Sequence, residues 1–451
     1  MPRQTWSSRL TYILTVAGAT IGFGATWRFP YLVGLNGGGA YVLVFIIVMF
    51  LVGIPIILVE NVIGRRVMNN CVDAFGINNN KASNLWKIVG YMGLVGAFGI
   101  LAYYMVIGGW VLSYIANIIM GNFDLSSPIS KVATESFYHN EVDKNQHLIA
   151  LYTLAFVSVN YIILRKGIIE GIEHAVKYLM PLLFICLVVM VIKNLTLDGA
   201  MDGVIFYLKP DFSKITPQLF LDVLGQVFFA LSLGFGVMIT LSSHLNKKEN
   251  LVKTATITGI VNTLIAVLAG FMIFPSLFSA GLKPDSGPSL VFKTLPIAFS
   301  RMDFGNFFAV VFFSLLLIAA LTTSITIYQV IISVLYEKFH IKLKVSILLT
   351  LSFVYIFGNI PCVLSSGILS DVHILGRNIF DAFDFISGNI CFVLTSLGCC
   401  LFVSLVLKDL AKTELSNGKS KPYPTIVNIW FMYVRYVLPL VILVIFFYGV
   451  F

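Results

Sequence analysis

The sequence predicts an all-α integral membrane protein, and three observations support this fold class. Its 451 residues are 58% hydrophobic and 11% charged, and the mean hydropathy is +0.92. A soluble domain carries roughly 25% charged residues. Apolar runs of about twenty residues, the length that crosses the hydrocarbon core of a bilayer, recur along the whole chain, and the Lys and Arg residues between them are unevenly distributed.

Eleven apolar runs are each expected to form one membrane span. The first is too long for a cleavable signal peptide and leads directly into the second. The polar segments 121–146, 193–217, 281–303 and 408–426 are expected to be loops, and the whole chain, 1–451, to form a single transmembrane domain. The runs cover approximately residues 10–34, 39–64, 86–120, 147–164, 168–192, 218–243, 253–280, 304–336, 343–362, 376–407 and 427–450.

The positive charge indicates how the spans are oriented. We assign nineteen of the 30 Lys and Arg residues to the N-terminal side of the membrane, nine to the other side, and Arg28 and Arg435 to the interior of spans. Cytoplasmic loops are enriched in Lys and Arg, which places the N-terminus in the cytoplasm and, after eleven spans, the C-terminus outside. The net charge of +9 is therefore interpreted as a topology signal in the cell (inner or plasma) membrane, with lipid and not nucleic acid as the surrounding partner.

The six cysteines are interpreted as small core residues. Most lie in apolar surroundings, no pair has metal-site spacing, and segment 121–146 contains none, which excludes a disulfide within that loop. They are Cys71, Cys186, Cys362, Cys391, Cys399 and Cys400.

Closely spaced glycines interrupt two of the expected spans. Gly22 and Gly24 interrupt the first, and Gly234 and Gly236 interrupt the sixth. A single Gly-x-Gly is explained more readily by close helix packing, whereas two matched interruptions with polar neighbours favour an inverted-repeat secondary transporter. The two repeats would cover about 10–192 and about 218–407, followed by the eleventh span at about 427–450.

An interrupted helix exposes backbone groups that lipid cannot satisfy, so irregular backbone persists only where protein, water or a ligand completes it. The exposed N–H groups suit a carboxylate, and the exposed carbonyl groups suit Na⁺ or an ammonium group. A zwitterionic amino acid together with Na⁺ is the natural complement of such a break.

Several ordered motifs resemble the neurotransmitter:sodium symporter family. They are segment 19–30 (ATIGFGATWRFP), the NGGG of 36–39, Gly53 and Pro55 with Glu60 and Gly64, and segments 225–229 and 231–236. The resemblance covers essentially the whole chain. It implies a leucine-transporter-like fold of 5+5 inverted repeats plus an eleventh helix, with spans 1 and 6 unwound at mid-membrane, and sodium-coupled import by alternating access. Interrupted spans of this kind are already a known feature of that family.

The resemblance also implies a substrate site at the two interruptions. The residues of this site would bind the carboxylate, the amine and the side chain of the substrate, and Phe229 and Tyr104 would cover it as a lid. Taken alone, Tyr104 is explained equally well as a packing aromatic. The carboxylate residues are Phe23 and Gly24 (N–H) and Tyr104 (hydroxyl), the amine residues are Thr20, Phe229 and Ala230 (carbonyl) and Ser232 (hydroxyl), and the pocket residues are Ile100, Phe235, Thr323 and Ile327.

Gly22 sets the expected substrate class. Monoamine carriers of the family have Asp at this position, which supplies the carboxylate that their substrates lack. Glycine here implies that the substrate brings its own carboxylate. Because the pocket residues are mostly apolar, a hydrophobic amino acid is expected, with aliphatic side chains slightly preferred over aromatic ones.

One sodium site implied by the resemblance is complete. Its ligands are neutral oxygens, which suit a hard cation. Threonine hydroxyls in spans often bond only to their own helix, an alternative that is less favoured opposite the first interruption. The ligands would be the carbonyls of Gly18, Ile21 and Ala319 and the hydroxyls of Thr322 and Thr323.

A second sodium site is weakened relative to the family pattern. Ala25 replaces the usual Asn, and Ala230 replaces the usual Ser or Thr. Asn262 remains, with the carbonyls of Thr20 and Ala230. A buried cation with fewer ligands is poorly compensated for its lost hydration, so we expect one Na⁺ per substrate.

The neighbouring chloride site is also reduced. Gln226 is present, but Phe45 replaces the usual Tyr, Ala230 replaces Ser, and Ala266 replaces Ser or a substituting acid. With one cation fewer, the balancing anion is unnecessary. No chloride dependence and no organic cofactor are expected.

The resemblance implies a gate on each side of the substrate site. Arg28 and Asp384 would form the outer gate, although Arg28 could instead extend its charge outward to water. The inner gate would pair Arg3 with Glu337, where the family usually has Asp, and His244 replaces a usual Tyr. Two residues, Trp6 and Gln329, would support the inner gate.

Glu60 lies deep in the second span and is expected to accept N–H groups freed at the interruption of span 6. This interpretation makes Glu60 a structural support and not a proton carrier.

Three other functions remain open. An intramembrane enzyme would use Asp381 and Asp384, but the chain has no Gly-x-Gly-Asp or His-Glu-x-x-His motif to complete such a site. A carrier of the same fold for another small amine or an osmolyte such as a betaine would need an aromatic cage for a quaternary ammonium. A non-transporting sensor is the third alternative.

Overall fold

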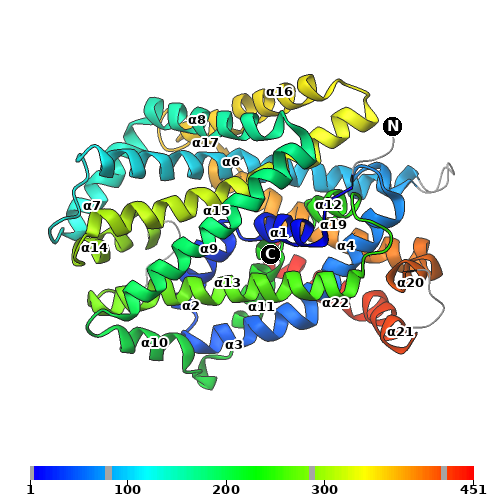
Figure 1. Ribbon diagram of the computed structural model, residues 1–451, viewed down its shortest axis with the longest axis horizontal. Helices are drawn as coiled ribbons and strands as arrows, with labels where there is room; N and C mark the ends of the chain where they lie inside the picture. Colours follow the sequence, from blue (N-terminus) through cyan, green and yellow to red (C-terminus); the bar gives the residue numbers. More distant parts are fainter. Residues whose placement is uncertain (1–4, 77–83, 284–289, 418–423, 451) are drawn as a thin grey trace.

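The computed structural model describes residues 5–76, 84–283, 290–417 and 424–450, and this part of the chain is almost entirely helical. Long helices pack side by side along the longest axis of the molecule (Figure 1). Short helices lie at its two ends: α7 (Lys131–Tyr138), α10 (Ala200–Leu208) and α14 (Leu295–Ser300) at one, and α20 (Asp409–Leu415) and α21 (Pro424–Met432) at the other.

The long helices follow the expected spans closely. Within the described residues, nine helices are long and apolar enough to cross a membrane, or ten if one bent pair counts as a single span. Several continue through π-helical turns. One span can therefore contain more than one α-helical element. The elements that build these spans and the interrupted ones are α1 (Arg9–Thr20), α2 (Phe29–Leu35), α3 (Gly39–Val48), α4 (Ile54–Val67), α6 (Lys87–Ile119), α8 (Gln146–Leu164), α9 (His174–Leu195), α11 (Pro217–Ala230), α12 (Val237–Ser242), α13 (Leu251–Ser279), α15 (Gly305–Ser333), α16 (Leu343–Val354), α17 (Ile360–Leu364), α18 (Ile379–Phe385), α19 (Phe392–Phe402) and α22 (Leu438–Val450).

Two expected spans are not continuous helices. The bent pair is α1 and the helix Gly24–Leu35, which meet at an angle of 56°. The sixth expected span is divided between α11 and α12, and each half is too short to cross a bilayer alone. The number of eleven spans therefore stays a prediction.

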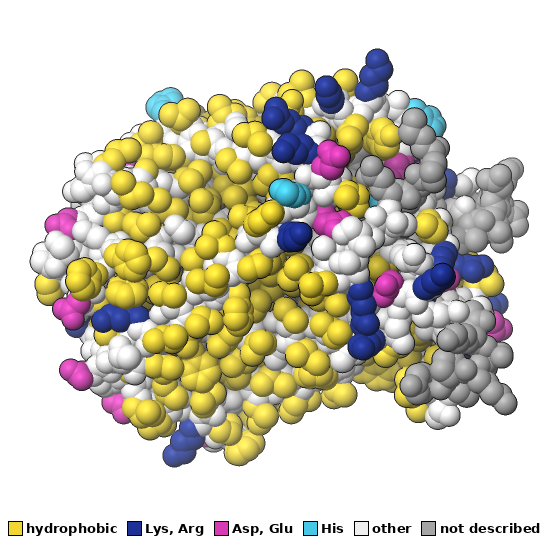
Figure 2. Space-filling model, in the orientation of Figure 1, with side chains coloured by type: hydrophobic (Ala, Val, Ile, Leu, Met, Phe, Trp, Pro, Cys, Tyr) yellow, Lys and Arg dark blue, Asp and Glu magenta, His cyan; other side chains and the backbone are white. Residues whose placement is uncertain are grey.

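The outer surface of the helical bundle is apolar. Figure 2 shows hydrophobic side chains over most of the visible face, with charged residues concentrated towards the ends. Large side chains such as Leu151, Ile185 and Leu440 are more than half exposed. Contiguous apolar patches of this extent are unusual on a soluble protein, and this belt is the surface expected in contact with lipid.

The polar connecting segments contain more structure than the expected loops. In segment 121–146, the side chain of Ser130 accepts a hydrogen bond from the Ala133 N–H at 3.2 Å and caps α7. A two-stranded hairpin, β1 (His373–Ile374) with β2 (Arg377–Asn378), precedes α18 and pairs His373 with Asn378. Caps and tight turns of this kind produce short elements that a search for long apolar runs does not detect.

The cysteines occupy the positions expected of core residues. Five are buried and Cys186 is partly buried, and all six are free thiols. Among the described residues, no group of three or more His, Cys, Asp and Glu side chains could hold a metal ion.

A buried ion pair joins the end of α4 to α20. Arg65 is fully buried, and its Nε lies 2.6 Å from a carboxylate oxygen of Glu414. The guanidinium also donates to the backbone carbonyl of Glu249 and, at 3.0 Å, to the side-chain oxygen of Asn417. Lys247 lies 3.5 Å from the same Glu414 oxygen. The segment between the tenth and eleventh expected spans is thereby tied to α4 and to the loop after α12.

Replacing Glu414 with Ala is expected to lower stability by about 3–5 kcal/mol, because the Arg65 charge would remain buried without its partner. The matched control is Glu249→Ala, since the Glu249 side chain pairs with Arg9 at 3.8 Å and both are 28% exposed. Such an exposed pair contributes about 0–1 kcal/mol. Thermal unfolding in detergent measures the stability of both variants. Equal shifts of the unfolding midpoint in the two variants would contradict the role assigned to the buried pair.

Candidate functional site

The two interrupted helices meet at the centre of the molecule, and side chains satisfy their free carbonyl groups. The Ser232 hydroxyl, in the gap between α11 and α12, donates to the Ala19 carbonyl at 2.9 Å. The amide of Asn262, on α13, donates to the carbonyls of Thr20 and Ala230, each at 3.2 Å. Each of these bonds reaches a carbonyl at the end of a helix half, which is where intrahelical partners are missing.

The gap between α11 and α12 has a left-handed backbone. Ser232, Gly234 and Gly236 have φ angles of 50°, 80° and 76°. A Cβ on Gly234 would lie 2.2 Å from the Phe392 carbonyl oxygen, so this position needs glycine for both its conformation and its close contact.

Glu60 satisfies the backbone of this gap from α4. Its carboxylate accepts the Gly234 N–H at 2.8 Å, and the side chain is completely buried. This contact is the one expected of Glu60 from the sequence, at the interruption of the sixth span.

A small central cavity lies between the two interruptions. It measures about 10 Å³, which is room for about one water molecule. Phe23 and Ala230, which were expected at the substrate site, do not line it, whereas Ala19 and Gly22 do. The other lining residues are Thr20, Gly24, Ile100, Tyr104, Phe229, Ser232, Phe235, Thr323 and Ile327, all of them expected at the substrate site.

The expected carboxylate donors lie beside this cavity. The Phe23 N–H donates to the Tyr104 hydroxyl at 3.2 Å, which joins the start of the second helix half to α6. A Cβ on Gly22 would lie 2.2 Å from the Tyr104 hydroxyl oxygen and 2.6 Å from that of Thr323. Any side chain at position 22 would therefore occupy the space between these polar groups.

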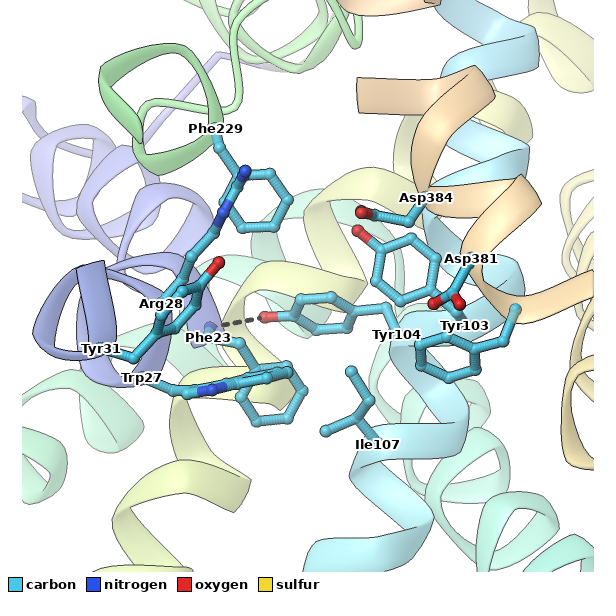
Figure 3. A pocket seen from close by; sticks show the side chains of 11 residues that line it. Phe23, Trp27, Arg28, Tyr31, Tyr103, Tyr104, Ile107, Phe229, Asp381 and Asp384 are labelled. Carbon is cyan, nitrogen blue, oxygen red and sulfur yellow. Dashed lines mark hydrogen bonds between the residues drawn. The ribbon is translucent and has the colours of Figure 1, made fainter. Parts of the chain in front are cut away.

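A larger cavity of about 170 Å³ adjoins the central one. We name it the outer cavity and its side of the molecule the outer side, after the orientation expected from the sequence; the opposite side, where Trp6 lies, is named the inner side. Tyr104 and Phe229 line both cavities and so form the partition between them. Figure 3 shows the outer cavity, with Arg28 on one wall and Asp384 on the opposite wall. The Arg28 guanidinium lies 4.5 Å from the centre of the Phe229 ring. Within the described residues, Arg28 and Asp384 form no ion pair with each other, so the two expected gate residues stand apart across the cavity.

Three of the residues expected at the complete sodium site, Gly18 on α1 and Thr322 and Thr323 on α15, lie close together. The Thr323 hydroxyl donates to the Gly18 carbonyl at 2.9 Å, and a Cβ on Gly18 would lie 3.6 Å from the Thr322 hydroxyl oxygen. Thr322 itself donates to the carbonyls of Ile318 and Ala319 at 3.1 Å, as hydroxyls on helices commonly do. Neutral oxygens from two helices, all buried, form a set that fits Na⁺.

The inner side of the site is closed by the N-terminal segment. The Trp6 indole donates to the Leu241 carbonyl at 3.0 Å, and the Trp6 N–H donates to the His244 carbonyl at 3.2 Å. Trp6 and Gln329 are both buried. Arg3, the expected partner of Glu337, lies outside the described residues, so this pair stays a prediction.

Several residues of the site were not anticipated from the sequence. The outer cavity is also lined by Trp27, Tyr31, Tyr103 and Phe380. On α6, Ile100, Tyr103, Tyr104 and Ile107 follow the i, i+3, i+4, i+7 spacing of one helix face. From the sequence, that spacing could have identified Tyr103 and Ile107 as residues on the same face as Ile100 and Tyr104.

Replacing Gly22 with Ala is expected to abolish most of the thermal stabilisation by Na⁺, because the new methyl group would displace Tyr104 and Thr323. Ligands that bind only the folded state raise its thermal midpoint. The control is Gly225→Ala, since a Cβ there meets nothing within 4 Å. The shift between K⁺ and Na⁺ buffers measures the effect, and a Gly22→Ala protein with the wild-type shift would contradict this geometry.

Comparisons with known proteins agree on one family. A model described as the sodium:neurotransmitter symporter family matches residues 3–155 and 133–451. A sodium-dependent transporter of Haemophilus influenzae is 64% identical over an alignment of 453 positions, which covers 100% of this chain and 98% of that protein. The sodium-dependent transporter YhdH of Bacillus subtilis is 35% identical over 442 residues, which are 98% of this chain and 96% of that protein.

The fold is also that of a solved transporter. The crystal structure of MhsT in complex with L-phenylalanine superposes with a TM-score of 0.88 at 35% identity, and the match covers 100% of both chains. The all-helical, leucine-transporter-like fold agrees with the arrangement described above, and the relatives are transporters and not enzymes. The chain therefore belongs to the sodium:neurotransmitter symporter family and is a sodium-dependent symporter of the membrane.

Proposed function

We propose that this symporter imports a hydrophobic L-amino acid together with one Na⁺, independently of chloride. The observation that carries the proposal is the Phe23 N–H paired with the Tyr104 hydroxyl beside a glycine at position 22. These two donors can turn to a ligand carboxylate, and the protein supplies no carboxylate of its own at this point. The substrate must then carry its own carboxylate as well as its ammonium group.

The amine would be held at the opposite side of the cavity. Carbonyl oxygens of Thr20 and Ala230, which now accept from Asn262, have a second lone pair available for an ammonium group. Ser232 fixes the adjacent Ala19 carbonyl. Neutral carbonyls around a primary ammonium favour an amino acid over a quaternary amine, which prefers an aromatic cage.

The side-chain part of the cavity favours an apolar substrate. Ile100, Phe235 and Ile327 line it and are buried. MhsT holds L-phenylalanine in its structure, which gives no support to a preference for aliphatic side chains. The proposal accordingly covers hydrophobic side chains of both kinds. Because the cavity is small, binding requires Phe229 and Tyr104 to move.

The position of Asn262 supports coupling to a single Na⁺. Its amide nitrogen lies between the two carbonyls that would bind a second sodium ion. Two N–H donors satisfy both carbonyls without a cation, and alanine at positions 25 and 230 offers no side-chain oxygen. A cation in this position would have to break both hydrogen bonds and would gain too few ligands in return.

Chloride independence rests on Gln226. Its amide donates one N–H to the Gly24 carbonyl at 2.7 Å, so one of the two donors that this side chain could offer an anion is already used within the protein. Phe45, Ala230 and Ala266 add no hydrogen-bond donors there.

We also propose that the N-terminus is cytoplasmic and the C-terminus outside, so that the cavity between Arg28 and Asp384 faces outward. Sodium between α1 and α15 would stabilise the arrangement in which Trp6 closes the inner side. Approach of Arg28 to Asp384 above the substrate would then close the outer side, as alternating access requires.

Replacing Tyr104 with Phe is expected to raise the amino-acid concentration for half-maximal binding about 10- to 100-fold, because a hydrogen bond to a charged group contributes about 1.5–3 kcal/mol. The control is Tyr328→Phe, a buried tyrosine whose hydroxyl has no hydrogen-bond partner among the described residues. Competition by L-phenylalanine and by its decarboxylated amine, phenethylamine, in proteoliposomes measures how strongly the carrier prefers a substrate with a carboxylate. Equal competition by the two compounds would refute the amino-acid proposal.

Sodium dependence of uptake is expected to have a Hill coefficient of about one, since a single binding site gives no cooperativity. Replacing chloride with gluconate should leave uptake unchanged. Thr322→Val should raise the half-saturating Na⁺ concentration, whereas Thr350→Val, which removes a buried hydroxyl bonded only to Ser346 on α16, should not. A Hill coefficient of about two or a chloride requirement would contradict the proposed coupling.

A further inference from the structure

A groove on the outer surface of the bundle lies apart from the substrate site. It has a volume of about 300 Å³ and runs between α8 and α16, which lie side by side in Figure 1. Leu154, Val157 and Tyr161 on α8 face Leu348 and Leu351 on α16. Leu154 is 43% exposed and Leu348 is 58% exposed, so the groove is open to the surrounding lipid.

A hydrogen bond between the two walls marks one end of the groove. The hydroxyl of Tyr355 donates to the Ala150 carbonyl at 2.9 Å and joins the two helices there. The polar atom of Ser158, on the groove wall, is bonded to the Leu154 carbonyl at 2.8 Å. Apart from Ser352 and the Tyr161 hydroxyl, the walls therefore present an apolar surface from Tyr161 to Tyr355.

The other end of the groove is strongly basic. Arg165 and Lys166 follow the end of α8, and Lys342 and Lys344 lie at the start of α16. All four are exposed, and none forms an ion pair with another residue in the described ranges. Figure 2 shows Lys and Arg side chains gathered at the upper right, where these two helices end.

Tyr161 and Leu348 lie only four residues from this basic end, which is about 6 Å along a helix. The acidic residues nearest in sequence, Glu170 and Glu337, are fewer than the basic ones. An apolar groove that opens at uncompensated positive charges matches the chemistry of an anionic lipid, because basic pockets between helices bind lipid head groups on the cytoplasmic side.

We propose that this groove binds one acyl chain of an anionic phospholipid of the cytoplasmic leaflet, with its phosphate at Arg165, Lys166, Lys342 and Lys344. A second copy of the chain is a poorer occupant. In a two-fold symmetric pair with its axis along the membrane normal, the same residues of both copies meet at the same depth. The four basic residues of one copy would then face those of the other, and such like-charge contacts disfavour association.

Native mass spectrometry of the full-length protein in detergent tests this proposal, with phosphatidylglycerol and phosphatidylethanolamine as the added lipids. The wild type is expected to bind phosphatidylglycerol at least about tenfold more tightly, because each basic residue near an anionic head group adds about fivefold. Replacing the four basic residues with Gln should remove this difference. A matched control replaces Lys209 and Lys214, near the opposite end of the bundle, with Gln and should keep it.

A second variant fills the groove and leaves its charges in place. Ser158→Phe with Ser352→Phe should weaken binding of phosphatidylglycerol as strongly as loss of the basic residues does. The Na⁺-dependent thermal shift, which does not involve the groove, checks that each variant is folded. Equal binding of both lipids, undiminished binding by the filled variant, or a dimer that disappears when the groove is filled would each overturn the proposal.

Discussion

The structure depends on one constraint: a backbone that is interrupted inside a bilayer must find hydrogen-bond partners within the protein or in a ligand. Spans 1 and 6 are both interrupted, and each interruption is satisfied largely by the other and by neighbouring helices. Ser232 reaches Ala19, Asn262 reaches Thr20 and Ala230, and Glu60 accepts the Gly234 N–H. The proposed substrate site is the small cavity that these contacts leave between the two breaks.

The same constraint connects ion binding to access. The proposed sodium ligands lie on α1 and α15, and α1 also carries the first residues of the proposed substrate site. On the outer side, Tyr104 and Phe229 separate the central cavity from the one that contains Arg28 and Asp384. On the inner side, Trp6 bonds to the backbone at the end of α12. A change in the interrupted region can therefore reach both gates through short, continuous contacts.

The sequence predicted the fold and the family well because the signals are strong and local. Long apolar runs set the helices, and glycine at positions 22, 24, 234 and 236 marked the two interruptions. The residues around the central cavity were reached through the family motifs, and most of them line it. Phe23 and Ala230 do not line it; Phe23 lines the outer cavity instead.

Contacts between distant segments could not be obtained in this way. The pair of Arg65 with Glu414 joins residues 349 positions apart, and no local pattern identifies such a partner. The amide of Asn262 was expected as a sodium ligand, but its nitrogen donates to two carbonyls, a choice that depends on the surrounding geometry. Short helices such as α7 and α20 arise from caps and tertiary contacts in segments too polar to show a span.

Hydrogen–deuterium exchange of the intact transporter tests the central claim most directly. The account predicts that Na⁺ with an L-amino acid, compared with K⁺ alone, slows exchange of the amides in segments 19–26 and 229–236 together, because the two ligands complete both breaks. Unchanged exchange in both segments, or protection of one without the other, would contradict it.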